Sequence, residues 1–301
     1  MAWVHTQEFS GHAPYKVNMY FVADFQLGSE ATQKQLIRNQ IKDIAADKDS
    51  ITYILGDIED DDRPSTRTIR EGAFAGRKEI LDRDAKKHML WIDHEVIPLL
   101  LPLANAGKGI GGVLAGHHWY KLTDSKSGLG MTSTEYICKR LTALSGREVP
   151  YLGVMSSWVW LIFHSHRGVK NGIRKLMHIQ HGVGGGGTLG AALNRLIKTK
   201  DGRPADIYVR GHDCQLVAAK QPEITPKYSQ TPELMTNNIL YLNLGSATQG
   251  YTITKDDPNY AEMAMMRPGS LGWGCIHLQL KNESRALDRN YNLTVKGTIE
   301  I

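Results

Sequence analysis

Three features that would place a protein outside the soluble globular class are scarce in this sequence of 301 residues. No apolar run approaches the roughly 18 residues that cross a bilayer, and residues 1–15 carry polar and charged side chains where a signal peptide needs an apolar block. The three cysteines, Cys138, Cys214 and Cys275, are too few and too scattered for a disulfide framework. We therefore expect a cytoplasmic protein with no membrane contact and with reduced cysteines.

The sequence also lacks a strong charge of either sign. Its net charge of +5 and its isoelectric point near 8.9 permit an anionic substrate without requiring a nucleic acid. A content of 41% hydrophobic and 22% charged residues is that of an ordinary globular protein. A chain of this length supports one core of roughly 200–300 residues, so we expect a single domain over residues 1–301 with insertions at its surface.

Short apolar runs rich in β-forming residues predict the strands of the core. They cover residues 17–23, 51–55, 110–115, 154–163, 175–180, 207–209, 239–244 and 275–280. Between the first two runs, Ile37, Ile41 and Ile44 recur at helical spacing behind Ser29, a candidate N-cap. The chain therefore opens with a predicted strand, helix and strand.

The second half of the chain predicts closely spaced strands, including a hairpin in which 154–163 turns through 167–172 into 175–180. Mixed strands with helices before and after them indicate an α/β fold, a four-layer α-β-β-α sandwich of two mixed sheets flanked by helices. We expect helical insertions over about 63–108 and 121–150, and an exposed loop over about 222–238.

Polar residues that can bind metal or transfer protons stand just after five of the predicted strands. In chain order they are Asp24, Gln26, Asp57, Asp60, His117, His118, His181, His212 and Cys214. In α/β sheets, sites form in the crevice beyond the carboxyl ends of the strands, so these residues can converge. Carboxylates and imidazoles together suit Zn, Mn or Fe, and a carboxylate can bridge two ions that polarise a phosphoryl oxygen and supply a hydroxide nucleophile.

The order of these clusters resembles the calcineurin-like metallophosphoesterases, whose motifs are D-x-H, G-D-x-x-D, G-N-H-D/E, an isolated H and G-H-x-H. The resemblance covers residues 17 to about 280. It implies that Asp57 bridges two metals, that Asp24 binds the first, and that His117, His181 and His212 bind the second.

The same resemblance assigns catalytic roles next to the metals. His118 would protonate the leaving oxygen or stabilise charge on the phosphoryl group. Asp60 would orient a metal ligand or His118. Asn243-Leu244-Gly245-Ser246 resembles the N-x-G-S turn that closes the site in this superfamily.

Three residues depart from the family motifs. Gln26 replaces the histidine of D-x-H, Cys214 replaces the last histidine of G-H-x-H, and Trp119 stands where an acid follows the catalytic histidine. Gln26 and Cys214 would both bind the first metal, for which a thiolate is a good ligand and an amide oxygen a weak one. Alternatively, Gln26 only contacts a ligand, Cys214 is a small buried hydrophobe, and His117 is a packed neighbour.

Other polar segments have both a structural and a functional interpretation. Glu59, with Asp61 and Asp62, is typical of a solvated acidic face. Residues 63–87 are basic and suit a solvated helix or a track for a phosphate backbone. The glycines at 184–187 suit a connector or a phosphate-binding helix start.

The sequence as a whole predicts a metal-dependent hydrolase of phosphate esters, acting as a phosphodiesterase or as a nucleotide or nucleic-acid phosphoesterase. Its cofactors would be two divalent ions of Mn, Zn or Fe, and its partner a phosphate-ester substrate, with nucleic acid as one form of it. The alternative is a relative of the same fold that holds one metal or none and serves as a binding or structural module. Gln26, Cys214 and Trp119 motivate that alternative.

Overall fold

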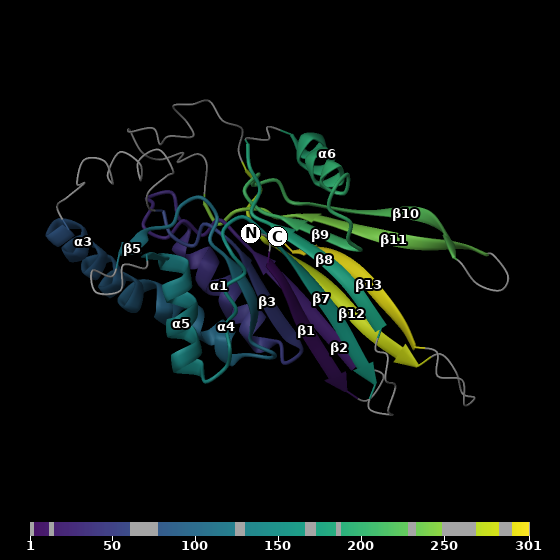
Figure 1. The fold of residues 1–301 in the computed structure, drawn as a ribbon, viewed down its shortest axis with the longest axis horizontal. Helices are drawn as coiled ribbons and strands as arrows, with labels where there is room; N and C mark the ends of the chain where they lie inside the picture. Colours follow the sequence, from purple (N-terminus) through teal and green to yellow (C-terminus); the bar gives the residue numbers. More distant parts are fainter. Residues whose placement is uncertain are drawn as a thin grey trace.

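Two β-sheets packed face to face form the centre of the protein, and helices cover their outer faces (Figure 1). A computed structural model describes residues 3–11, 15–60, 78–123, 130–165, 173–184, 188–227, 233–248, 269–282 and 291–300. The described residues contain a six-stranded sheet in the order β1-β7-β8-β9-β11-β10, a five-stranded sheet in the order β13-β12-β2-β3-β4, and a separate two-stranded sheet of β5 and β6. The predicted four-layer sandwich is confirmed.

The five-stranded sheet contains the predicted strand–helix–strand unit. Its strands are β2 (Tyr15–Val22), β3 (Ser50–Leu55), β4 (Ile110–Leu114), β12 (Trp273–Asn282) and β13 (Tyr291–Glu300). The first three are parallel, whereas β12 is antiparallel to both β2 and β13. The helices beside this sheet are α1 (Lys34–Ala46), α3 (Lys78–Trp91), the π-helix η1 (Ile92–Val96), α4 (Ile97–Asn105) and α5 (Ser133–Ser145).

The six-stranded sheet mixes parallel and antiparallel pairs. Its strands are β1 (Trp3–Gly11), β7 (Ser156–Ser165), β8 (Ile173–Gln180), β9 (Ile207–Arg210), β10 (Val217–Lys227) and β11 (Glu233–Asn243). The predicted hairpin is present as the antiparallel pair β7 and β8, and β8, β9 and β11 run parallel to one another. Helix α6 (Leu189–Thr199) packs on the outer face of this sheet.

Strand β3 is buried along its whole length and β2 is buried from Met19 to Val22, and both carry apolar side chains on each face. Met19, Phe21 and Tyr53 point between the sheets, where they pack in one cluster with residues of the opposite sheet. Neighbours of opposite parity, such as Ile54, point to the helices and pack with Ile41 of α1. This alternation fixes the register of the strands and decides which side chains face the other sheet and which face the helices.

Helix α1 buries Ile37, Ile41 and Ile44, as their spacing predicts, but its N-cap differs from the prediction. The residue before the helix is Gln33, not Ser29, and its side chain does not cap the helix. The hydroxyl of Ser29 instead accepts the backbone N–H of Ala31, so Ser29 stabilises the preceding turn.

Residues 222–227 and 233–238 of the predicted loop instead belong to β10 and β11, which pair across Pro222 and Asn238. This prediction was wrong, since Pro222 and Pro226 both stand within strand β10. Strand β10 lies at the edge of its sheet, where a residue without an N–H is tolerated.

The insertion expected over 121–150 begins with strands β5 (Lys121–Thr123) and β6 (Gly130–Thr132) before helix α5. The described part of the 63–108 insertion is helical through Asn105. Within the described ranges, no helix has the length and apolar character needed to cross a membrane.

Candidate metal centre

Four side chains that follow different strands meet at one edge of the sandwich. Asp57 follows β3 and His117 follows β4, whereas His181 and His212 follow β8 and β9 of the other sheet. Each offers one ligand atom, and these atoms all lie within 4.8 Å of one another. The sequence placed these residues beyond the carboxyl ends of the strands, and the structure brings them together there.

The three histidine rings of this cluster face one another edge-on. Their centroids are 4.8 Å apart for His117 and His181, 4.7 Å for His117 and His212, and 5.0 Å for His181 and His212. The ring planes are inclined by 61° to 73°, so the rings converge rather than stack. Three imidazoles and a carboxylate in this arrangement are a ligand set that suits Zn, Mn or Fe.

The hydrogen bond of His181 shows how its ring is held for a metal. Its Nδ1 lies 2.7 Å from the carbonyl oxygen of Leu55, which only accepts, so Nδ1 carries the proton. Its Nε2 then lies 3.1 Å from Oδ2 of Asp57. Two such acceptors attract each other only through a shared cation, either a proton or a metal ion. Burial opposes a proton there, but Asp57 outweighs burial and raises the pKa of His181 to about 9.

Asp57 is held as a carboxylate by the loop after β4. Its Oδ1 accepts the backbone N–H groups of His117, at 2.6 Å, and His118, at 3.0 Å, while Oδ2 turns to His181. Burial alone would raise the pKa of Asp57, but His181, followed by the charge and the N–H group of His118, lowers it overall. A Cβ on Gly116 would lie 2.2 Å from Oδ1, so only glycine allows this approach.

The opposite sheet supplies His212 in its neutral form. Burial, followed by the charges of His181 and His117, lowers the pKa of His212 to about 3. Its backbone N–H donates to Oδ2 of Asp24 at 2.9 Å, which ties the loop after β9 to the loop after β2. A neutral imidazole is the form that binds metal.

Backbone strain is concentrated at this centre. Among the described residues, the non-glycine positions with positive φ are Asp24, Gln26, Asp57, His212 and Cys214, with φ between 45° and 67°. Such residues are uncommon and cost free energy, and they cluster at sites where the backbone aims a side chain. All five belong to the residues that the sequence predicted as metal ligands.

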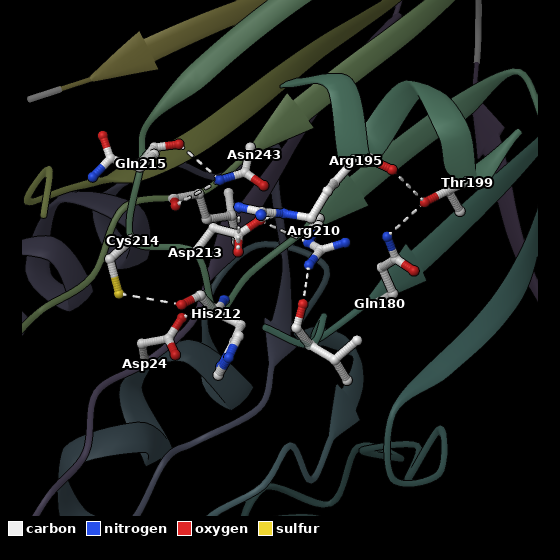
Figure 2. Close-up of polar contacts among 12 residues, drawn as sticks. Asp24, Gln180, Arg195, Thr199, Arg210, His212, Asp213, Cys214, Gln215 and Asn243 are labelled. Atoms are coloured by element: carbon white, nitrogen blue, oxygen red, sulfur yellow. Dashed lines mark hydrogen bonds and ion pairs between the residues drawn. The ribbon is translucent and has the colours of Figure 1, made fainter. Parts of the chain in front are cut away.

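The three residues predicted for the first metal lie beside the four-residue cluster but outside it. Asp24 is buried, and its pKa rises to about 7 because burial outweighs the attraction of His181. The thiol of Cys214 donates to the carbonyl oxygen of His212 at 3.5 Å (Figure 2), and burial raises its pKa. Gln26 donates its backbone N–H to the carbonyl oxygen of Asp57. Their role as ligands stays a prediction.

The predicted catalytic pair lies next to the cluster. His118 follows His117 in the loop after β4, and its Nδ1 is 2.9 Å from Oδ1 of Asp60. This contact fits the expectation that Asp60 orients His118. The roles of the two residues in catalysis also stay predictions.

Sequence reasoning misjudged Glu59. It was expected on a solvated acidic face, but it is buried, and its Oε2 lies 2.5 Å from Nε2 of His88. The ring of His88 in turn stacks on Tyr120 with centroids 4.6 Å apart. No local spacing signals a pair separated by 29 residues. Asp61 and Asp62 lie outside the described residues.

Sequence reasoning also missed Arg210 and Asp213, which flank Gly211 and His212. Nε of Arg210 lies 2.9 Å from Asp213, and its Nη2 donates to the carbonyl oxygen of Val183 at 2.7 Å. Arg195 of α6 also contacts Asp213, at 3.1 Å (Figure 2). Arg210 thus joins the loops that carry His181 and His212, and its position just before Gly211-His212 was the available signal.

Two further predicted segments lie largely outside the described residues. In the 184–187 glycine run only Gly184 is described, and the hydroxyl of Thr188 accepts the N–H of Ala191 at the start of α6. In the basic 63–87 segment only residues 78–87 are described, and they belong to α3.

Comparisons with known proteins give only distant likenesses. No family model matches the chain, and no curated protein does. Among solved structures, it is similar to a single mutant of Vps29 from Entamoeba histolytica, at 12% identity over 95% of this chain and 100% of that chain, with a TM-score of 0.33. Wild-type Vps29 of that organism complexed with Zn²⁺ matches at 10% identity over 94% and 99% of the chains, with a TM-score of 0.31.

GAP50, the anchor in the inner membrane complex of Plasmodium, matches at 10% identity over 95% of this chain and 90% of that chain, with a TM-score of 0.28. With TM-scores this low, we infer nothing about this protein's function from these structures. Its own layers and strand order show an α/β sandwich with a candidate metal site at the strand ends. That is the architecture implied by the resemblance to the calcineurin-like metallophosphoesterases.

Proposed function

We propose that this protein is a metal-dependent hydrolase of phosphate esters, with a phosphodiester of the nucleotide or nucleic-acid type as its substrate. The convergence of Asp57, His117, His181 and His212 within 4.8 Å carries this proposal. The facing acceptor atoms of His181 and Asp57 support it, because a divalent ion could occupy the position between them that a proton otherwise fills.

A divalent ion held by these four residues would polarise a phosphoryl oxygen and lower the pKa of water. The chain's own contribution to the reaction is the position of His118. With Nδ1 turned to Asp60, its Nε2 is the ring nitrogen that can donate a proton to the leaving oxygen. We further propose that Asp24, Gln26 and Cys214, together with Asp57, would hold the ion that the family resemblance calls the first metal, at the cost of deprotonating the Cys214 thiol.

The test compares variants loaded with Mn or Zn, with bis-p-nitrophenyl phosphate as substrate. Asp57→Asn should lose both metal and turnover, because it removes the carboxylate charge at the centre of the cluster. His118→Ala should keep its metal and lose turnover by about 10²–10⁴-fold, the scale of general acid catalysis. His164→Ala, on strand β7 and away from the cluster, is the control and should keep both. Equal turnover in all four proteins would remove the proposal.

The second candidate function is a binding or structural module with the same fold. One observation favours it: three imidazoles and a carboxylate can complete a tetrahedral shell, as in structural zinc sites, without leaving a position for substrate. One tightly bound equivalent of metal without turnover on any phosphate ester would establish this second candidate. Two equivalents with turnover would exclude it.

A further inference from the structure

A groove of about 840 Å³ lies on the helical side of the protein, between α1 and the segment formed by the end of α3, η1 and α4. Its apolar lining includes Leu27, Ile41, Trp91, Leu99 and Pro102. It begins at Leu27 and Gly28 in the loop after β2 and runs along α1 to Ala46. The phosphate-ester proposal assigns no role to this surface.

One wall of the groove carries a row of positive charges. Lys34, Arg38 and Lys42 are four residues apart, so they share one face of α1 and extend over about 12 Å of the helix. All three are exposed, and within the described part of the chain no ion pair joins any of them to an acid. Glu95 is the only acid among the described residues that line the groove. An apolar floor beside unpaired cations calls for an occupant that is apolar on one side and acidic on the other.

The opposite wall contains a π-helical turn, a rare form that is frequent at functional sites. Pro98 follows this turn and lacks the N–H that would bond to the carbonyl of His94 in an α-helix, which accounts for the wider turn. His94, Glu95 and Pro98 all line the groove. The irregular turn therefore shapes the wall that faces the cations.

We propose that this groove binds an acidic amphipathic helix of a partner protein. The apolar face of that helix would lie on Ile41, Leu99 and Pro102, and its carboxylates would meet the cation row. A helix laid nearly parallel to α1 presents acidic residues at the same four-residue spacing, so three ion pairs can form at once.

The lining favours a helix over a single-stranded nucleic acid. A nucleic-acid track needs successive aromatic side chains on which bases stack, and Trp91 is the only Trp, Tyr or Phe among the described lining. Apolar and proline side chains suit the buried core of a protein interface, with the cations as its polar rim. This proposal is independent of the metal centre and does not require catalysis.

The test is a selection from a displayed library of helical peptides of about four turns, with the full chain as target. Binders to the wild type would be depleted on a Lys34→Gln, Arg38→Gln, Lys42→Gln variant. The matched control, Lys108→Gln with Lys198→Gln and Lys220→Gln, removes the same charge from exposed positions outside the groove lining. Circular dichroism and thermal melting would establish that both variants fold.

We expect the selected peptides to carry Asp or Glu at four-residue spacing beside an apolar stripe. They should bind the wild type and the control equally, bind the groove variant at least about tenfold more weakly, and weaken with salt. Their binding should change the tryptophan fluorescence of the wild type but not that of Trp91→Phe.

Three outcomes would overturn the proposal. They are a selection that yields no peptide specific for the wild type, selected peptides that lack acidic residues, and peptides that bind the groove variant unchanged. Binding of a single-stranded DNA oligonucleotide that is lost only in the groove variant would make the groove a nucleic-acid track instead.

Discussion

At the scale of the residue, the candidate metal centre depends on positions where ordinary side chains are strained or do not fit. Asp57 and His212 adopt left-handed backbone conformations, which turn their side chains into the cluster. Gly116 lets Asp57 come close to the N–H groups of the next loop. The free-energy cost of these backbone conformations is tolerated because backbone hydrogen bonds join the surrounding loops to one another.

Replacement of Gly116 by alanine tests this arrangement. Gly116 and Gly146 both have positive φ, of 81° and 68°, but a Cβ on Gly116 meets Asp57 whereas a Cβ on Gly146 meets nothing within 4 Å. Gly146→Ala should therefore lower the free energy of unfolding by about 1–2 kcal/mol and leave zinc affinity unchanged. Gly116→Ala should in addition weaken zinc binding at least about tenfold, measured by calorimetric titration. The same zinc affinity in both variants would contradict this account.

At the scale of the element, two loops of the six-stranded sheet hold their histidines through one buried arginine. Arg210 ends strand β9, contacts Asp213 after His212, and donates to Val183 after His181. Gly182 leaves room for it, because a Cβ there would lie 2.7 Å from its Nε. Arg210 therefore adds a side-chain link between the two loops to the backbone hydrogen bond from Gly211 to Gln180.

Arg210→Met should separate the loops while keeping much of the apolar bulk of the side chain. We expect zinc affinity to fall about 10–100-fold, the usual effect of losing a group that orients metal ligands. Arg195→Met is the matched control, because Arg195 contacts the same Asp213 carboxylate from helix α6. Equal losses in both variants would show that the charge balance of Asp213, and not the link between loops, controls the site.

At the scale of the whole molecule, the candidate metal centre joins the two sheets. Asp57 and His117 come from the five-stranded sheet, and His181 and His212 come from the six-stranded sheet. A metal bound to all four would act as a further cross-link between the sheets, which meet mainly through apolar side chains and are also joined by the hydrogen bonds of His181 and His212. Metal binding and global stability are therefore coupled.

Metal removal should lower the melting temperature of the entire protein in one step. At a free metal concentration 100 times the dissociation constant, binding adds about 2.7 kcal/mol to the free energy of unfolding, which raises the melting temperature by a few degrees. Scanning calorimetry with Zn, then with a chelator, measures the difference. Asp57→Asn should melt at the same temperature under both conditions. A wild type that is insensitive to the chelator would argue against a metal between the sheets.

The sequence by itself determined the elements that carry the site. Periodic apolar residues predicted the core strands and helix α1, and the polar residues after the strands predicted Asp57, His117, His181 and His212. These signals are readable because side-chain periodicity and turn chemistry are local. Prediction failed where the local signal was weak or conflicting. Edge strand β10 contains prolines and was predicted as a loop, and the polar strand β1 was not predicted at all.

Only the tertiary structure decided which distant residues meet. The pairing of Glu59 with His88, the contact of Arg210 with Val183, and the position of Cys214 outside the four-residue cluster each depend on how two loops pack. The groove between α1 and α4 also depends on packing, because its row of cations becomes a candidate binding site only when apolar residues of another helix lie opposite it. Such contacts join residues far apart in the chain, and their distances follow from the packing of both sheets and their helices at once.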